Sequence, residues 1–546
     1  MQAPTHPEIA KLLTRKPRVC IVGGGWNGLY ALKWFVEEGL DDVVLFEQTN
    51  SIGGVWVYTD KPGGCFRNTR ATASKSYLHA SDFPMPESFG HFPTHTEVLD
   101  FLKDYAKHFE LYPYIKLQHK VHKARKTKDG QQWKVVVMPN QEEEQNAGLS
   151  GGAEAEKEVH HFDILVCCSG QHQVPRETHL EEPFTHFTGE MMHSHCYKYP
   201  TKAMKGKTVL IVGGGESASD VAEVCEKASR TILAIRSGTW FQDRTVGANQ
   251  PADMVFTKHQ RLLGFSDFQS WLVWIGRYGI IEMMWGKGGS GIKEWQPSCA
   301  YFHGFLNKSR DIVDKAALGK VVARRGIAKI EGKRVWFTNE SKPEDVDLII
   351  FATGYLSNLP FLLPAHNFRY NAYKLVFDPN DPTLCYIGSA RPMIGSIPAL
   401  GELQARWATK VYTGQVSLPS TPAMLAQMEA DKIRHKRVFP ADDHHLPQLV
   451  NHWEYSDEIA SYFGAKPDLV RWFFRNPFSA PWSAHIYRVE EGGKVREEAI
   501  KNIERTWLPN HYSFNAFNKA MLAFDIYVAL NVFGLFCLLY VYLFLW

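Results

Sequence analysis

The stretch VCIVGGGWNG at residues 19–28 decides the fold, because it joins an apolar segment to a glycine-rich turn and then to a helical pattern. Its first four residues carry no charge, which is typical of a buried parallel strand. Gly23, Gly25 and Gly28 follow the spacing of a turn whose backbone N–H groups bind a pyrophosphate at the start of a helix. Gly24 lies in the same turn. The stretch therefore predicts a dinucleotide-binding unit.

A second turn of this kind occupies residues 209–220, with the sequence VLIVGGGESASD. Gly213 and Gly215 again follow an apolar strand, and a helical pattern starts immediately after them. Two such turns in one chain predict two nucleotide cofactors and an α/β fold with two Rossmann-like domains.

The residue that ends the next strand indicates which nucleotide each turn binds. Glu47 follows the apolar run 43–46 and lies nineteen residues after Gly28, where a carboxylate accepts hydrogen bonds from a ribose with free hydroxyls, as in FAD. Arg236 follows the run 232–235 after the second turn, where a cation suits the 2′-phosphate of NADPH. The alternative is that both are solvated charges at the surface.

Composition excludes several classes of protein. The 546 residues include 61 Lys and Arg against 58 Asp and Glu, so the net charge of +3 gives no electrostatic case for nucleic acid. The nine cysteines include no CxxC pair, which favours a reducing compartment. The first glycine turn is followed by no CxxxxC redox pair, which argues against a disulfide reductase. No metal site is expected.

The strands of the chain suggest that the second nucleotide domain is inserted into the first. The buried strand at 163–170 has a near copy at 347–355, which is expected to return the chain to the first domain. An acidic, Gly- and Ala-rich stretch at 140–158 is expected to be a surface loop. The predicted order is FAD domain, inserted NADPH domain, remainder of the FAD domain and C-terminal segment, at residues 17–180, 181–342, 343–515 and 526–546.

Residues 526–546 contain no charge and are long enough to cross a hydrocarbon core of about 30 Å, which predicts a C-terminal transmembrane anchor with the catalytic domains facing the cytosol. A buried core helix is the alternative. The tryptophan-rich segment 271–285 contains Arg277 and Glu282, which argue against a second span. It could lie on the membrane surface, in the core or along a substrate tunnel.

The motif FTGEMMHSHCY at 187–197 fits FxGxxxHxxxY, and on this motif the chain resembles the flavin-containing monooxygenases. The resemblance extends from about residue 17 to about residue 420 and includes GGVW at 53–56, FATGY at 351–355 and GSIP at 395–398. The apolar C-terminal segment resembles that of the membrane-bound animal enzymes, which implies the endoplasmic reticulum membrane.

The resemblance implies an enzyme in which NADPH reduces FAD and the reduced flavin traps dioxygen as a hydroperoxide. One oxygen atom then passes to a soft nucleophile, an amine nitrogen or a sulfide sulfur. The expected partners are a small-molecule substrate, dioxygen and membrane lipid, and a homo-oligomer remains open. Alternatives are a Baeyer–Villiger monooxygenase, an NADPH oxidase that releases hydrogen peroxide, and a membrane-tethered binding protein without turnover. The motif ends in Tyr197, where the Baeyer–Villiger enzymes have tryptophan.

The resemblance also implies roles for single residues. FAD-contacting positions match Gly23, Gly25, Gly28, Glu47, Val55 and Trp56, and NADPH-contacting positions match Ser217, Ala218, Ser219, Asp220 and Arg236. His193 belongs to the motif that joins the two domains. Where many members place an asparagine beside the flavin, this chain has Thr72 followed by Ala73, with Asn68 four residues upstream. Thr72, or Asn68 if the loop slips, is therefore the candidate catalytic residue.

Overall fold

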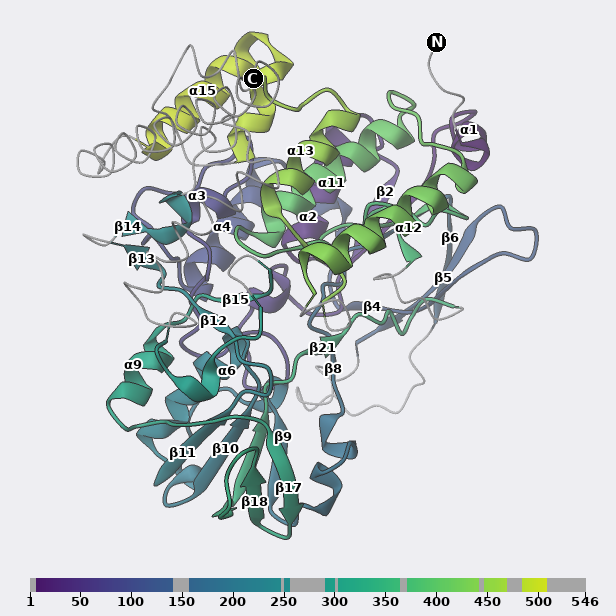
Figure 1. Cartoon of the computed structure of the whole chain (residues 1–546). Helices are drawn as coiled ribbons and strands as arrows, with labels where there is room; N and C mark the ends of the chain where they lie inside the picture. The colour runs from purple at the N-terminus through teal and green to yellow at the C-terminus, as the bar shows by residue number, and fades with distance from the viewer. Residues whose placement is uncertain are drawn as a thin grey trace, which may run out of the picture.

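The structure is a computed structural model, and it describes residues 6–140, 157–246, 250–255, 290–299, 303–363, 371–440, 446–468 and 484–507. The chain forms two α/β bodies, and Figure 1 shows the first body above the second. Each body is built on a five-stranded parallel sheet, as the two glycine turns predict.

The upper sheet has the order β22-β7-β1-β2-β3. β1 is central, with Val19 opposite Val43 on one side and Ile164 on the other, and all four of its residues are buried. This explains why its sequence is apolar without alternation. The strands are β1 (Val19–Val22), β2 (Val43–Phe46), β3 (Ile115–Lys116), β7 (Ile164–Cys167) and β22 (Leu384–Tyr386).

The helices of the upper body pack on this sheet and on one another, with α11 lying along α2. Local sequence sets their starts: the Thr94 hydroxyl accepts from Glu97 N–H at the start of α4, and the Ser396 hydroxyl accepts from Ala399 N–H in α11. The helices are α1 (Pro7–Leu12), α2 (Trp26–Glu37), α3 (Lys75–Leu78), α4 (His95–His108), α11 (Ile397–Tyr412), α12 (Thr421–Val438), α13 (His452–Tyr462) and α15 (Gly493–Trp507), with 3₁₀ turns η1 (Gly54–Trp56), η2 (Tyr112–Tyr114) and η12 (Ala484–Glu491).

The lower sheet has the order β16-β11-β10-β20-β9 and is also parallel. Its strands are β9 (Glu190–His193), β10 (Thr208–Val212), β11 (Arg230–Ala234), β16 (Val322–Arg324) and β20 (Leu348–Phe351). The helical elements around it are α6 (Glu216–Val221), α9 (Asp311–Ala317), η4 (Thr178–Leu180), η5 (Phe184–His186), η6 (Ser194–Cys196), η7 (Lys202–Met204), η8 (Ala222–Glu226), η9 (Ala252–Val255) and η11 (Lys293–Trp295).

The position of β20 differs from the expectation that the strand at 347–355 returns the chain to the first domain. Leu348 pairs with Val209 of β10 and with Glu190 of β9, so β20 belongs to the lower sheet. The return comes later, where β22 joins the upper sheet beside β7. The predicted end of the inserted domain at residue 342 therefore lies too early, because β20, a buried apolar strand, still belongs to the sheet of that domain.

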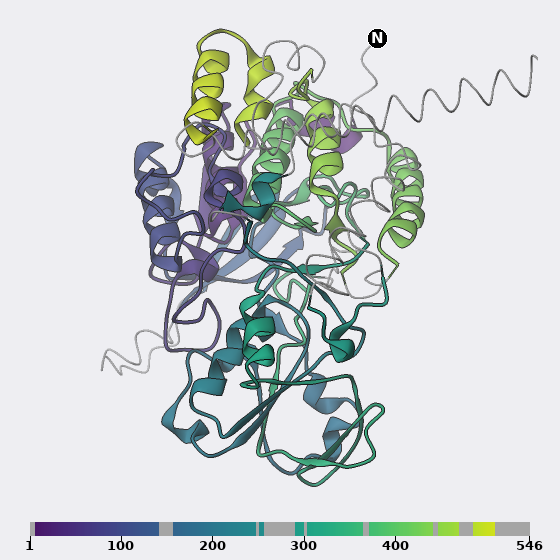
Figure 2. The same ribbon diagram turned by 60° about the vertical axis from the view of Figure 1, so that its left-hand side comes forward.

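Small sheets flank the two bodies, and one of them joins the crossings between the bodies. β8 (Val174–Pro175) pairs antiparallel with β21 (Tyr355–Leu356), so the outgoing and returning segments run side by side between the two bodies, which Figure 2 shows one above the other. The other small strands are β4 (His119–Lys126), β5 (Trp133–Pro139), β6 (Glu158–Phe162), β12 (Trp240–Phe241), β13 (Thr245–Val246), β14 (Gln250–Pro251), β15 (Leu306–Asn307), β17 (Ile327–Glu331), β18 (Arg334–Phe337), β19 (Glu344–Asp345), β23 (Arg391–Pro392) and β24 (Leu449–Val450).

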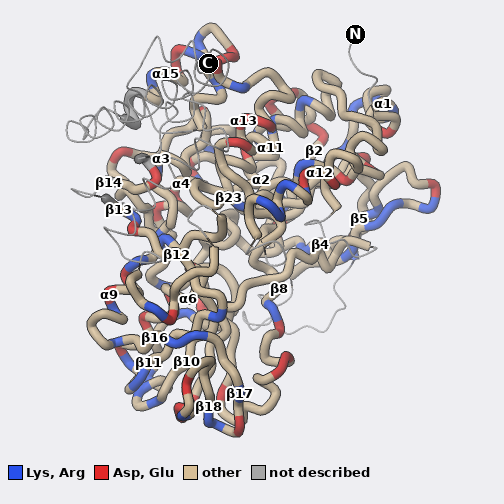
Figure 3. Tube along the Cα trace, viewed as in Figure 1, with Lys and Arg blue, Asp and Glu red and all other residues tan. Residues whose placement is uncertain are grey.

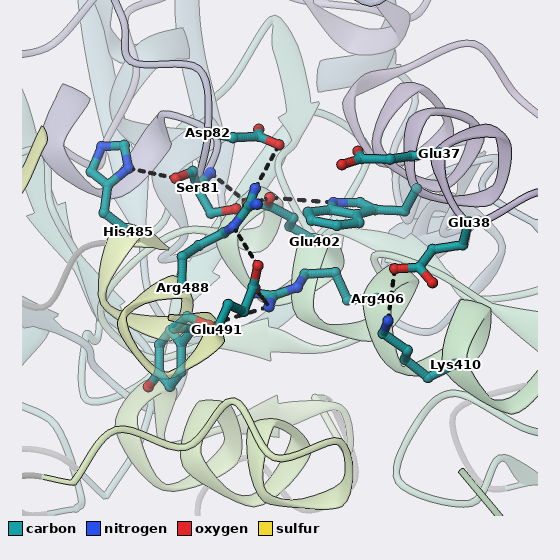
Figure 4. A network of polar contacts seen from close by, with 12 residues as sticks. Glu37, Glu38, Ser81, Asp82, Glu402, Arg406, Lys410, His485, Arg488 and Glu491 are labelled. Carbon is teal, nitrogen blue, oxygen red and sulfur yellow. Dashed lines mark hydrogen bonds and ion pairs between the residues drawn. The ribbon is translucent and has the colours of Figure 1, made fainter. Parts of the chain in front are cut away.

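A charged network attaches η12 to the upper body (Figure 4). Arg488 of η12 donates to Asp82 at 2.8 Å, and Lys33 of α2 pairs with the same carboxylate oxygen at 2.6 Å. Glu491 of η12 pairs with Arg406 of α11. Charges elsewhere are mixed, and both bodies carry residues of both signs (Figure 3).

Among the described residues, no helix combines the length and the apolar character that a membrane crossing needs. The predicted anchor at 526–546 and the segment 271–285 both lie outside the described residues, as do residues 141–156 of the acidic stretch.

Candidate nucleotide and oxygenation sites

The first glycine turn lies at the carboxyl end of β1, where only glycine fits. Gly23 has a φ of +107°, and a Cβ there would lie 2.7 Å from the carbonyl oxygen of Cys168, which follows β7. A Cβ on Gly28 would lie 1.9 Å from the carbonyl oxygen of Gly23. The start of α2 is therefore pressed against the turn, which is the close approach that the spacing predicts.

The N-terminus of α2 fits a pyrophosphate. Gly25 is its N-cap and no side chain caps it, so N–H groups of the first turn are left for a ligand. Gly54 of η1 faces Gly25, and a Cβ on Gly54 would lie 3.0 Å from Gly25 Cα. Two glycines thus keep this side of the turn free of side chains.

Glu47 lies beside the same turn, as its spacing predicts. Its Oε2 accepts from Gly24 N–H at 2.7 Å, and its Oε1 accepts from the Thr49 N–H and hydroxyl, both at 2.9 Å. Each carboxylate oxygen has two lone pairs, so this buried group can hold the turn and still accept from a ribose.

The Trp26 side chain packs against other aromatic rings. Its ring lies 6.0 Å from that of Trp56 and 5.8 Å from that of Phe101, and it is buried. Trp56 is half-buried and Val55 is exposed, both in the 3₁₀ turn η1 that faces Gly25.

The second turn repeats the geometry of the first. Gly213 has a φ of +136°, and a Cβ there would lie 2.2 Å from the carbonyl oxygen of Ala352, which follows β20. Gly215 is the N-cap of α6 without a side-chain cap, and a Cβ built on it meets no atom within 4 Å. Open space therefore lies at the start of α6, as a bound phosphate requires.

Glu216, the first residue of α6, would repel a phosphate, but its carboxylate is bound elsewhere. Oε1 accepts from Lys308 N–H at 2.9 Å and Oε2 accepts from the Ser309 hydroxyl at 3.0 Å. Asn307 Nδ2 donates to the carbonyl oxygen of Gly214 and to the Ser219 hydroxyl, which fixes the turn from the β15 side.

The other residues predicted at the second turn differ in exposure. Ala218 and Ser219 are buried, whereas Ser217 and Asp220 are half-buried. Burial, followed by the charge of Glu216, raises the pKa of Asp220 to about 7. Arg236 is exposed just beyond β11, where its side chain passes Gly326. The carboxyl end of β11 lies beside that of β10, so Arg236 lies at the edge of the sheet that carries the second turn.

His193 ends β9 and joins the two crossing segments. Its Nε2 lies 3.1 Å from the carbonyl oxygen of Gly354, and its Nδ1 accepts from His195 N–H at 3.0 Å. Burial lowers its pKa to about 4, so the ring is neutral at pH 7. These contacts hold the His193 ring between β9 and the segment that follows β20.

Thr72 and Asn68 are placed differently. Asn68 is exposed and donates to Glu223 of η8 at 2.6 Å, across to the lower body. Thr72 is half-buried and Ala73 is buried, beside the fully buried Ser74. Asn68 is thus held by the lower body, whereas Thr72 lies in the segment that leads to Ser74.

Sequence reasoning missed several residues that shape the two turns. Asn27 fills the space between Gly388 and Gly401, where added Cβ atoms would lie 2.0 Å from its amide. Asn307 contacts the second glycine turn and Asp253 contacts Ser74, and both lie in segments that carry no recognisable motif. Asn27 alone had a local signal, since it lies inside the first glycine motif.

Replacing Gly28 with alanine should weaken FAD binding, because the new Cβ would overlap the Gly23 carbonyl oxygen and push α2 away from the turn. The expected loss is about 1 to 3 kcal/mol, as for other overpacked sites. The FAD content of the purified variant, measured by absorbance after release, checks this. Gly90→Ala is the control, because the nearest atom to its Cβ lies at 4.0 Å. Equal FAD content in all three proteins would contradict the assignment.

Comparison with known proteins agrees with this geometry. The family described as flavin-binding monooxygenase-like matches residues 16–545. Mouse (Mus musculus) dimethylaniline monooxygenase (N-oxide-forming) 2 is 31% identical over 87% of this chain and 89% of its own length. Human flavin-containing monooxygenase 5 is 30% identical over 88% of this chain and 90% of its own.

Among solved structures, the fold is similar to that of S-allyl-L-cysteine S-oxygenase from Allium sativum. That protein is 21% identical, with a TM-score of 0.60 over 90% of this chain and 98% of its own. The OTEMO structure in complex with FAD and NADP has a TM-score of 0.57 at 13% identity, over 82% of this chain and 97% of its own. The chain belongs to the flavin-binding monooxygenase-like family, and it is a flavin-dependent monooxygenase with FAD and NADPH as cofactors.

Proposed function

We propose that the protein transfers one oxygen atom of dioxygen to an amine nitrogen or a sulfide sulfur of a small molecule. The observation that carries this proposal is the pair of uncapped glycine turns, one beside Glu47 and the other on the sheet edge that carries Arg236. The names of two similar proteins, one N-oxide-forming and one an S-oxygenase, support these substrate classes.

We propose that the first turn binds FAD. The N–H groups at the start of α2 would bind the pyrophosphate, and Glu47 would accept from the ribose. The residues assigned to FAD are Gly23, Gly24, Gly25, Gly28, Glu47, Val55, Trp56, Thr72 and Ala73.

The second turn would bind NADPH, with Arg236 as the partner of the 2′-phosphate. His193 would hold the junction between the sites as a neutral ring. The residues assigned to this site are His193, Gly213, Gly215, Ser217, Ala218, Ser219, Asp220 and Arg236.

When bound, FAD supplies the oxygen chemistry, taking hydride from NADPH and activating dioxygen. The chain binds and orients both nucleotides and limits the access of water. The resemblance places Thr72 beside the flavin, where its hydroxyl can donate one hydrogen bond. A single donor favours some loss of reducing equivalents as hydrogen peroxide.

The test mixes FAD-loaded protein with NADPH in air and with a tertiary amine, a thioether or a cyclic ketone. We expect an N-oxide and a sulfoxide, together with measurable hydrogen peroxide because of Thr72. An ester from the ketone alone would instead show a Baeyer–Villiger enzyme. Peroxide without any oxygenated product would show an oxidase, and protein without flavin would contradict the proposal altogether.

Replacing Arg236 with alanine should weaken the binding of NADPH and leave that of NADH nearly unchanged, because only NADPH carries the phosphate that the guanidinium would bind. Loss of one charged hydrogen-bonding group is worth about 1.5 to 3 kcal/mol, roughly a ten- to hundredfold rise in KM for NADPH. Arg230→Ala is the matched control, since Arg230 begins the same strand and pairs with Glu344. Equal losses for NADPH and NADH would contradict the assignment.

We further propose that residues 526–546 anchor the protein in the endoplasmic reticulum membrane with the nucleotide domains in the cytosol. The uncharged composition of this segment supports the proposal.

Deleting residues 526–546 should move the protein from the membrane pellet to the soluble fraction without loss of FAD, because the glycine turns lie far upstream. Cell fractionation with an FAD assay checks both parts. Complete retention on membranes would show that another surface, such as 271–285, also binds lipid. Loss of FAD would show that the segment belongs to the core.

A further inference from the structure

One carboxylate of the inserted domain reaches the segment that we assign to the flavin. Asp253 lies in η9, directly after the hairpin of β13 and β14, and Figure 1 shows this hairpin beside α3 of the upper body. Its Oδ2 accepts from Ser74 N–H at 2.7 Å, and both residues are buried. Charge strengthens such a bond, because an ionised acceptor is roughly twice as effective as a neutral one.

Three backbone N–H groups of the segment 71–75 donate hydrogen bonds, and the bond from Ser74 to Asp253 is the second of them along the chain. Ala71 N–H donates to the Pro93 carbonyl and Lys75 N–H donates to the His91 carbonyl, both at 2.8 Å and both within the upper body. Between these anchors, Ser74 N–H is bound by a residue of the lower body. Thr72 and Ala73 lie between the first anchor and this one.

The same hairpin is tied to the second glycine turn. Ala252 N–H donates to the Arg244 carbonyl at 2.7 Å, and Arg244 Nη2 donates to the Ser309 hydroxyl at 2.9 Å. That hydroxyl donates in turn to Glu216, the first residue of α6. Hydrogen bonds together with the covalent chain of Arg244 and of Ala252 and Asp253 therefore connect the second glycine turn with Ser74.

The second oxygen of Asp253 is also buried and has no hydrogen-bond partner within the described part of the chain. Burial raises the pKa of Asp253 to about 6, against the opposing effect of hydrogen bonding with Ser74 and, after it, of the Lys308 charge. A carboxylate kept in such surroundings costs stability, so its presence calls for a function.

We propose that Asp253 is a positioning residue, which acts through Ser74 N–H to hold Thr72 and Ala73 against the flavin when the NADPH domain is docked. The inference rests on the proposed function, because it needs the flavin to lie beside Thr72. The inference predicts that the hydrogen bond from Ser74 N–H to Asp253 lowers the rate at which hydrogen peroxide is released during NADPH oxidation.

The experiment measures NADPH oxidation and hydrogen peroxide release in air, without organic substrate, by the full-length protein loaded with FAD. Asp253→Ala should raise the rate of peroxide release about tenfold, the lower value for losing a hydrogen bond to a charged group. FAD content and KM for NADPH should stay unchanged. Asp253→Asn should show a smaller rise, because the amide oxygen still accepts from Ser74 N–H.

The donor can also be removed. Ser74 has a φ of −68°, which proline can adopt, and Ser74→Pro removes the N–H. Because its Cδ would otherwise meet the carboxylate that lies 2.7 Å from the Ser74 nitrogen, Ser74→Pro is made in the Asp253→Ala background, where it should add no further peroxide release. Ser74→Ala keeps the N–H and should release peroxide as the unmodified protein does.

Asp243→Asn is the matched control, because Asp243 lies on the same stretch and pairs with Arg310 inside the lower body. An equal rise in this control, a further rise in the double variant, or unchanged peroxide release in Asp253→Ala would overturn the inference. If Asp253→Ala loses FAD, peroxide release is compared between Asp253→Asn and Ser74→Ala instead. The inference then requires a rise in Asp253→Asn and no rise in Ser74→Ala. Absence of FAD or of NADPH oxidation in the unmodified protein would contradict the proposed function instead.

Discussion

The structure depends on one steric constraint, the close approach of a backbone carbonyl to a glycine at the end of each central strand. The Cys168 carbonyl oxygen lies where a Cβ of Gly23 would be, and the Ala352 carbonyl oxygen has the same relation to Gly213. In both sheets the carbonyl comes from the strand next to the central one, β7 or β20. This approach positions the start of the following helix, and with it the N–H groups that face a phosphate.

The two nucleotide sites can work together only if the bodies that carry them keep a defined relation. Side-chain hydrogen bonds among the described residues contribute to this relation, and they include those of His193 with Gly354, of Asn68 with Glu223 and of Asp253 with Ser74. The first bond joins the two crossing segments, and the other two join the bodies directly. The last two have carboxylate acceptors and are therefore the stronger ones, but the relation between the bodies still depends on several contacts.

The sequence predicts those parts of the site that depend on local backbone geometry. Both turns and the place of Glu47 follow from spacing, because a strand, a turn and a helix fix these positions within a few residues, whereas the junction role of His193 is implied only by the resemblance. The place of β20 could not be predicted in this way, since an apolar strand suits either sheet equally well. Asp253, Asn307 and the glycines that enclose Asn27 escaped prediction because their contacts join residues far apart in sequence.

The segment from Thr72 to Asp82 shows how far such long-range contacts determine the chemistry. Ser74 is held by the lower body, whereas Ser81 donates through both N–H and hydroxyl to Glu402 of α11. Burial raises the pKa of Glu402 and Asp82 adds to the effect; Lys33 and Arg488 overcome burial and hold the pKa of Asp82 below its usual value. These paired charges are costly to expose singly, so η12 stays attached wherever this segment is ordered. The segment that contains Thr72 and Ala73, which we place beside the flavin, is therefore held by the inserted domain at one end and by α11 and η12 at the other.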